Sequence, residues 1–457
     1  MIPGNCWKAL FGALVCLGIL AGPAQSSAQQ FTQYYSVDCS NPSAQFPTIS
    51  SALAAATDGT SIYVPSGTTC TENVTVGYLK NIAIVTDWQK TFTLAGNLTI
   101  QSSHTVEIQG MAVTSPSGDG IDVNSSTDVT LTFVSSVNNP GTGLVLGTSQ
   151  VTIAGAGTFS NNGNIGINAS TNSTLSILAW GGTVDISNNI GTGLNIDRSV
   201  VNNLGATTIN NNQATSGGTF PNGFGINEYG GAKSVMSALF GPLTISSNAG
   251  GGVSLQETSE MSIGGNISWA PYLVNIKGNG PFGVDADYGG SLTLFGGVTV
   301  ADHTIAGISL YGNSQAAIYN SNQIVHNGTS SDSRRAGIQV EQGSQAYVSD
   351  ATIQNNGGPG ILGLVHATLD VEDSIFSSNA AGAILCDEST ALETDLARSV
   401  LGEAKGCKVS SYPGEHLHHG SIDLSLSLPD WQSMRARSIK LNRMSTSHRP
   451  AAAPIEK

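Results

Sequence analysis

The chain has 457 residues, of which 56 are glycine and only 11% are charged, where ordinary globular proteins have roughly 25%. Its formal net charge is −14, and residues 30–407 hold nine Lys and Arg against 27 Asp and Glu. This composition disfavours helices and favours strands joined by tight turns. The acidic body argues against nucleic acid and polyanionic substrates as partners.

The N-terminus has the pattern of a secretory leader. Lys8 precedes an apolar run over residues 9–21, and small residues follow it. This pattern predicts a signal peptide over residues 1–28, cleaved after Ala28 or Ala24. The run is too short for a transmembrane helix, and no later segment is long and apolar enough to span a bilayer. We therefore expect a secreted protein, extracellular or periplasmic, with no membrane span in the mature chain.

Two of the six cysteines lie in the predicted signal peptide, and the other four form two pairs in the sequence. A secreted chain folds in an oxidising compartment, so we expect two local disulfides, Cys39–Cys70 and Cys386–Cys407. The cysteines include no C-x-x-C pair, which argues against zinc. We expect no metal and no cofactor.

A repeat runs through the body. A glycine followed by an aliphatic residue or alanine recurs at steps of 22 to 32 residues, at Gly120, Gly143, Gly166, Gly193, Gly225, Gly252, Gly283, Gly307, Gly337, Gly360 and Gly382. Short alternating segments follow these glycines, and such strands bury their inner face only when successive repeats stack. The repeat predicts an all-β parallel β-helix, because propeller blades are longer and the nonapeptides of a calcium β-roll are absent.

The start of the body carries a family resemblance. The segment FPTISSALAAATDGTSIYVPSGTTCTENVTV, residues 46–76, has an amphipathic first half, with apolar residues at Ile49, Leu53 and Ala56. With the repeat, it resembles the right-handed parallel β-helix proteins of the pectin-lyase-like superfamily over residues 40–407. The resemblance implies a single-stranded solenoid with a short helix over its N-terminal end. It is specific for the fold and not for the chemistry.

These features predict the domain organisation. Residues 29–407 form the β-helix with caps at both ends. The segment 392–407 has a helical pattern and would close the C-terminal end together with Cys386–Cys407. Residues 408–457 lack periodicity and are predicted to be a flexible, mildly basic tail.

The catalytic motifs of the superfamily do not carry over. Its hydrolases resemble one another in Asn-Thr-Asp, Asp-Asp, Gly-His-Gly and Arg-Ile-Lys elements, and none lies in the repeats. Its lyases use a basic residue beside calcium, whereas this body has few cations. Arg334-Arg335 in a long loop is expected to be solvated, with anion binding as the alternative. If the chain is an enzyme, a polysaccharide-active hydrolase is favoured over a pectate-type lyase.

The repeat predicts which side chains face out. If the two aliphatic residues after each glycine face the core, the second and fourth residues face outward, about 4.8 Å from those of the next repeat. Acids, amides and rings at these positions are candidates for binding a polysaccharide. They are Asn195, Asn227, Ser254, Ser309 and Gln339, with Asp197, Tyr229, Gln256, Tyr311 and Glu341 as the substrate-binding candidates.

Three acids are candidates for catalysis. Asp285 and Asp287 lie two residues apart, at outward positions of one repeat, where they are either a catalytic pair or solubilising surface acids. Glu228 falls where other repeats have an aliphatic residue. A local register slip is the favoured explanation, and an inward carboxyl with a raised pKa is the alternative. His303, beside Asp302, is expected to lie solvated at a turn.

We thus expect a secreted, monomeric β-helix protein that binds or processes a polysaccharide or a cell-surface glycan. The alternative is a structural or adhesive extracellular protein without catalysis, which the missing family motifs favour.

Overall fold

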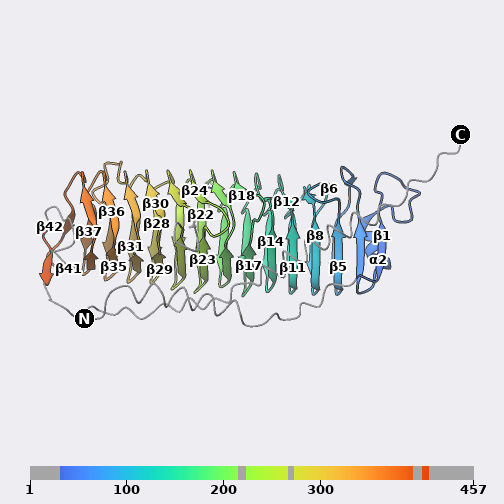
Figure 1. Cartoon of the computed structure of the whole chain (residues 1–457), viewed down its shortest axis with the longest axis horizontal. Coiled ribbons are helices and arrows are strands. Elements are labelled where there is room, and N and C mark those ends of the chain that lie inside the picture. The colour runs from blue at the N-terminus through green and yellow to red at the C-terminus, as the bar shows by residue number, and fades with distance from the viewer. Residues whose placement is uncertain (1–30, 215–222, 266–271, 395–403, 411–457) are drawn as a thin grey trace. The chain divides into compact units, whose positions relative to one another are not determined.

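The computed structural model describes residues 31–214, 223–265, 272–394 and 404–410 (Figure 1). The predicted signal peptide and the predicted tail beyond residue 410 lie outside the described residues. The described residues belong to one unit, a parallel solenoid of three sheets, which confirms the predicted all-β parallel β-helix. Among them, no helix is long and apolar enough to cross a membrane.

The strands follow one another from sheet to sheet. The 14-stranded sheet, here called the first sheet, contains β4 (Val74–Gly77), β7 (Leu98–Gln101), β10 (Ile121–Asn124), β13 (Leu144–Gly147), β16 (Ile167–Ser170), β19 (Leu194–Asp197), β22 (Phe224–Tyr229), β25 (Gly251–Leu255), β28 (Phe282–Asp287), β31 (Ala306–Tyr311), β34 (Ala336–Glu341), β37 (Ile361–Leu364), β40 (Ile384–Cys386) and β42 (Ala404–Lys405). The 16-stranded second sheet contains β1 (Gln33–Ser36), β2 (Thr60–Tyr63), β5 (Lys80–Val85), β8 (His104–Gln109), β11 (Thr127–Thr132), β14 (Gln150–Ala154), β17 (Thr174–Ile177), β20 (Val200–Asn203), β23 (Lys233–Ser237), β26 (Glu260–Gly264), β29 (Ser291–Leu294), β32 (Gln315–Ile318), β35 (Gln345–Ser349), β38 (Thr368–Glu372), β41 (Ala391–Thr394) and β43 (Lys408–Ser410). The 13-stranded third sheet contains β3 (Thr69–Cys70), β6 (Phe92–Leu94), β9 (Met111–Val113), β12 (Ser135–Ser136), β15 (Gly157–Thr158), β18 (Val184–Ser187), β21 (Thr207–Asn210), β24 (Leu243–Ser246), β27 (Val274–Lys277), β30 (Val298–Ala301), β33 (Asn322–Val325), β36 (Ala351–Gln354) and β39 (Ile375–Ser377).

One coil of the solenoid takes a strand from each sheet in turn, as β28, β29 and β30 do. Each strand pairs with the equivalent strand of the coils before and after it, so equivalent side chains stack in register. Val253, Val284, Ile308 and Ile338 form such a stack in the core and are fully buried. Burial of these aliphatic stacks is the main favourable term for the fold.

A ladder of buried asparagines closes the corner before the first sheet. Within the ladder a side chain donates from Nδ2 to Oδ1 of the asparagine one coil later wherever that residue is an asparagine, as Asn162 does to Asn189 at 2.9 Å and Asn248 to Asn279 at 2.9 Å. His303 occupies the next rung and is fully buried. The expectation of a solvated histidine is therefore wrong, because residue 303 falls on the rung that asparagine takes elsewhere.

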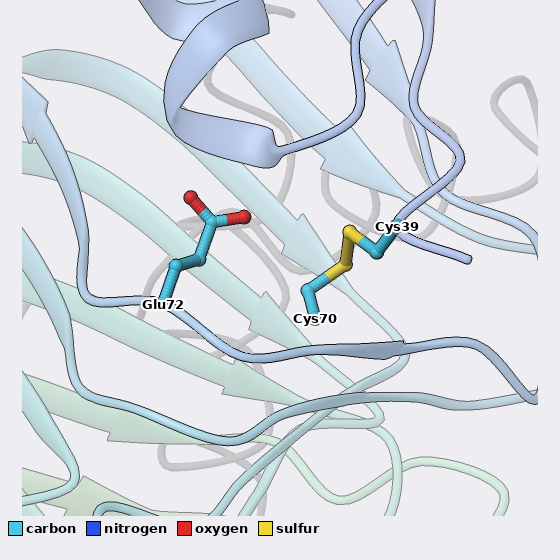
Figure 2. Close-up of side chains that lie close together, drawn as sticks. All are labelled: Cys39, Cys70 and Glu72. Atoms are coloured by element: carbon cyan, nitrogen blue, oxygen red, sulfur yellow. A yellow bond between two sulfur atoms is a disulfide. The ribbon is translucent and has the colours of Figure 1, made fainter. Parts of the chain in front are cut away.

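The N-terminal cap has the predicted form. Helix α2 (Ile49–Ala55) begins after Thr48, whose side chain accepts a hydrogen bond from the Ser51 N–H. The Glu72 carboxylate accepts from the N–H groups of Ile49 at 2.7 Å and Ser50 at 2.9 Å. Figure 2 shows Glu72 beside the disulfide that joins Cys39 to Cys70. A carboxylate at a helix N-terminus satisfies free backbone donors there, so Glu72 ties the helix to the coils.

The C-terminal end is only partly as predicted. The Cys386–Cys407 disulfide is present, which confirms the second pairing. The helix predicted over 392–407 is wrong where the structure describes it, because β41 and β42 are strands, and residues 395–403 lie outside the described residues. Leu392 continues the register of Leu369. Pairing with β41 satisfies the backbone N–H and C=O groups at the edge of β38. This tertiary contact outweighs the local helical pattern of the sequence. β43 also extends the solenoid beyond residue 407.

Candidate functional site

The register of the first sheet brings the predicted outward residues into two columns. Column 1 runs through β19, β22, β25, β28, β31 and β34 and contains Asn195, Asn227, Ser254, Asp285, Ser309 and Gln339. Column 2 lies two residues further along the chain from each of these and contains Asp197, Tyr229, Gln256, Asp287, Tyr311 and Glu341, of which Gln256 directly follows β25. Their inward neighbours, such as Val284 and Ala286, are fully buried.

The two columns differ in exposure, a difference that the alternating pattern does not predict. Column 1 is closed to solvent, with exposed fractions of 1% for Asn227, 0% for Ser254 and 7% for Asp285. Column 2 is half-buried and in contact with solvent from Asp197 to Tyr311, whereas Glu341 is buried. A ligand on this face therefore meets column 2 first.

Asp285 and Asp287 lie two residues apart on β28, Asp285 in column 1 and Asp287 in column 2. Burial, and secondarily the charge of Asp287, raises the pKa of Asp285 to about 7, while the Ser309 hydroxyl and the Arg334 charge oppose the rise. Burial also raises the pKa of Asp287. Two neighbouring carboxyls of this kind resist simultaneous ionisation, so the pair retains a proton near neutral pH.

Aromatic and polar groups surround the acid pair. The Tyr288 ring is 65% exposed and packs edge-on against Tyr311, with 6.1 Å between the ring centroids. Gln339 Nε2 donates to Glu341 Oε1 at 2.8 Å. Arg334 extends from the loop between β33 and β34, where its exposed side chain pairs with Asp332 at 3.4 Å. This exposure agrees with the expectation of a solvated arginine.

Column 1 also continues beyond the residues predicted from the sequence. Asn195 donates from Nδ2 to Asn168 Oδ1 at 2.9 Å, and Asn227 donates in the same way to Asn195 at 2.7 Å. Further along the sheet lies Asp122, whose pKa is raised to about 6 by burial and then by the charge of Asp119. The repeat places Asp122 and Asn168 one residue after Gly120-Ile121 and Gly166-Ile167, so the same spacing identifies them.

Glu228 points into the core. β22 keeps its register, with Glu228 opposite Ile196 and Leu255, so the favoured explanation of a local slip is wrong. The carboxyl is fully buried. Neither carboxyl oxygen makes a hydrogen bond of good geometry with any of the described residues. Burial raises the pKa of Glu228 well above its ordinary value, and the nearby Ser234 hydroxyl opposes this only in part. The side chain points away from both columns.

One group of three potential metal ligands stands out in the described part of the chain, formed by Cys39, Cys70 and Glu72 (Figure 2). The two sulfurs are joined in a disulfide, and both carboxylate oxygens accept hydrogen bonds from helix α2. Thiolates are the form of cysteine that binds metals, so the donor set of this cluster does not fit a metal ion.

One family model matches part of the chain and agrees with the fold. A family model described as a right handed beta helix region matches residues 237–397. The search of curated proteins finds no match. Among solved structures, the chain is similar to the A-modules of the mannuronan C-5 epimerases AlgE6 and AlgE4 from Azotobacter vinelandii, with TM-scores of 0.41 and 0.37. Each is 13% identical and covers 80% of this chain and 94% of its own.

The chain is also similar to pectate lyase Pel9A, with 11% identity, a TM-score of 0.25, and coverage of 85% of this chain and 82% of that one. These identities are too low to transfer the role of any residue. The three stacked parallel sheets show that the chain has a parallel β-helix fold, and the right handed beta helix model matches the part of it from residue 237 to residue 397.

Proposed function

We propose that the outward face of the first sheet binds a polysaccharide around β28, and that Asp285 and Asp287 carry acid–base chemistry on it. The observation that carries this proposal is the shielded position of Asp285 beside Asp287, which holds its pKa at about 7. Surface acids that only keep a protein soluble stay in contact with water and close to their ordinary pKa. Asp285 and Asp287 therefore differ from ordinary surface acids.

The reaction class that suits the pair is glycoside hydrolysis. A protonated carboxyl donates its proton to the glycosidic oxygen as the bond breaks, and a neighbouring carboxylate acts as base or nucleophile. Asp285 is the better acid, because it is the more shielded of the two. Tyr288 and Tyr311 offer ring surfaces for a sugar, and Tyr229, Gln256 and Asp197 offer polar groups to its hydroxyls.

The charge of the chain favours an uncharged polymer. With a net charge of −14, the protein repels polyuronates, which lowers their concentration near the site. A pectate-type lyase also needs a cation close to the reacting carbon, whereas Arg334 is paired with Asp332. We therefore propose a hydrolase for a neutral polysaccharide.

A non-catalytic structural or adhesive role is the second candidate. The hydrogen bonds of Asn168, Asn195 and Asn227 to one another favour it, since these amides already have partners within the sheet and are less available to a ligand. In this case the first sheet presents an ordered surface without chemistry.

Secretion through residues 1–28 and a monomeric mature chain belong to the same proposal. The two disulfides support an oxidising destination. N-terminal sequencing of the exported protein and its mass in solution test both parts.

A glycan array with the mature protein tests the proposal. We expect binding to at least one neutral polysaccharide and a loss of at least tenfold for Tyr311→Ala. Asp285→Asn and Asp287→Asn should abolish release of reducing sugars while retaining binding. Asp370→Asn on β38, in the second sheet, is the matched control. Binding without any released sugar from pH 4 to 8 would support the non-catalytic role, and no binding at all would remove both polysaccharide roles.

A further inference from the structure

Gln339 carries a buried oxygen without a partner close to the acid pair. Its Nε2 donates to Glu341 Oε1 at 2.8 Å on the same strand, β34. Its Oε1 has no hydrogen-bond partner among the described residues, and the side chain is only 3% exposed. A buried acceptor without a donor costs free energy. A donor from within the site would therefore stabilise this residue.

Ser309 lies between Gln339 and Asp285. The register pairs Asp285 with Ser309 and Ser309 with Gln339, so β28, β31 and β34 place the three side chains on consecutive rungs of column 1. Adjacent strands of a sheet lie about 4.8 Å apart. All three side chains are at least nine-tenths buried, so each meets its neighbours in the column rather than solvent.

The Ser309 hydroxyl is the group that both neighbours can use. It hydrogen-bonds to the Asp285 carboxyl, where it favours the ionised form. A serine hydroxyl has one hydrogen to donate and also accepts, so it can donate to only one neighbour at a time. Rotation about the Cα–Cβ bond of a serine moves its oxygen among three staggered positions.

We infer that Ser309 is a two-position relay that links the carboxyl of Asp285 to the amide of Gln339. When Asp285 is ionised, the Ser309 hydroxyl donates to its carboxylate, and Gln339 Oε1 stays without a donor. When Asp285 is protonated, its O–H donates to Ser309 Oγ, and the Ser309 hydroxyl donates to Gln339 Oε1. The proton stays on Asp285 in this exchange, and only the direction of the hydrogen bonds reverses.

The relay supports both forms of the acid. The inference rests on the proposed function in taking Asp285 as the group that protonates the glycosidic oxygen. As Asp285 gives up its proton, the Ser309 hydroxyl turns back and donates to the new carboxylate. Ser309 and Gln339 are positioning residues, since they act on Asp285 and need not touch the sugar. Glu341 determines which end of the Gln339 amide is left to accept.

Other groups around Asp285 act beside the relay. Asp287 on the same strand and Arg334 in the loop before β34 both influence the pKa of Asp285. On the opposite side, β25 contributes the uncharged Ser254 at the adjacent rung. Glu341 in column 2 is a further acid on this face. Substitutions of Ser309 and Gln339 leave all these groups in place.

A titration of the Asp285 carboxyl by ¹³C NMR, assigned by its loss in Asp285→Asn, tests the relay. Gln339→Met keeps the length of the side chain and removes the acceptor, so it should lower the pKa of Asp285 by about one unit. Added apolar surface alone has the opposite effect, because desolvation raises the pKa of a carboxyl. An unchanged or raised pKa would overturn the inference. Gln345→Met, at an exposed position on β35, is the control and should have no effect.

Ser309→Ala tests whether Gln339 acts through Ser309. Alone, it should raise the pKa of Asp285, because the carboxylate loses its donor. In the Ser309→Ala background, Gln339→Met should have no further effect, since the link between the two side chains is gone. An equal fall in both backgrounds would show that Gln339 acts on Asp285 without Ser309, which contradicts the relay.

Crystal structures of the mature wild-type protein at about pH 5 and about pH 9 give a test without variants. We expect Ser309 Oγ within hydrogen-bond distance of Gln339 Oε1 in the acid form and of Asp285 alone in the alkaline form. A Ser309 hydroxyl that stays away from Gln339 at both pH values would also overturn the inference.

These measurements use no glycan, so the relay and the proposed hydrolysis can fail separately. If hydrolysis is observed, its alkaline limit in Gln339→Met should fall together with the pKa of Asp285. A lowered pKa in a protein that releases no sugar would support the relay and remove only the proposed hydrolysis.

Discussion

His303 takes the rung that Asn279 takes one coil earlier, and the two side chains reach equivalent carbonyls. Asn279 Nδ2 donates to Ile245 O at 3.0 Å, and His303 Nε2 lies 3.1 Å from Ile276 O, where Ile245 and Ile276 are paired in register. His303 Nδ1 lies 3.3 Å from another carbonyl, Asn279 O. A neutral imidazole carries one N–H and can donate to only one of the two.

Replacing His303 with asparagine should restore the ladder and stabilise the protein by about 1 kcal/mol at pH 7, because Asn279 gains an acceptor. The gain should grow in acid. Burial, the main cause, lowers the pKa of His303 below its ordinary 6.5, so the unfolded chain binds the proton first as pH falls. The stability of the wild type is thus complete above about pH 6.5 and declines below it.

Urea unfolding between pH 4.5 and 8 measures this effect. His104→Asn, at an exposed position on β8, serves as the control. A stability difference between His303→Asn and wild type that stays constant over this range would contradict the linkage.

Glu228→Leu should stabilise the protein by roughly 2 kcal/mol at pH 7, because an unpartnered buried carboxyl is replaced by the residue type of the neighbouring rungs. The pKa of Glu228 is raised in the folded state above its ordinary 4.5, so wild-type stability is complete below that pH and falls as pH rises above it. The gain from Glu228→Leu should accordingly be smallest near pH 4. Glu257→Gln, on an exposed turn, should show no such trend in the same urea titrations, and a gain independent of pH would argue against a buried acid.

Two neighbours should shift the pKa of Asp285 in opposite directions. Asp287→Asn removes a like charge and should lower the pKa of Asp285 from its value near 7, whereas Arg334→Gln removes an opposite charge and should raise it. ¹³C NMR titration of the Asp285 carboxyl measures both shifts. Shifts of the same sign would show that the two substitutions act through packing. If the proposed hydrolysis is observed, its alkaline limit should move with this pKa.

Glu72→Ala should loosen helix α2 and cost about 1–2 kcal/mol, because two backbone N–H groups lose a carboxylate acceptor at a helix N-terminus. Hydrogen exchange should show faster exchange at the amides of Ile49 and Ser50, with the Cys39–Cys70 disulfide intact. Glu257→Ala is the control for the loss of a negative charge. Unchanged exchange at Ile49 and Ser50 would mean that the Glu72 contact does not hold the cap.

Much of the candidate site is predictable from the repeat. A period-two strand after a recurring glycine determines which side chains face outward, and stacking in register then determines their neighbours. Asp285, Asp287 and Tyr311 follow directly from this pattern. The N-terminal helix and both disulfides are also predictable, since each depends on residues close together in the sequence.

The remaining features depend on contacts between coils, which local periodicity does not contain. The repeated spacing of glycine and aliphatic residues is enough to predict the architecture and the orientation of most side chains in the first sheet, although not that of Glu228. Three features become visible in the folded chain alone: Glu228 lies in the core, His303 replaces an asparagine, and column 1 around Asp285 is closed to solvent. Each of these outcomes depends on what the adjacent coil places about 4.8 Å away, and the residues that do so are more than 20 positions distant in the chain.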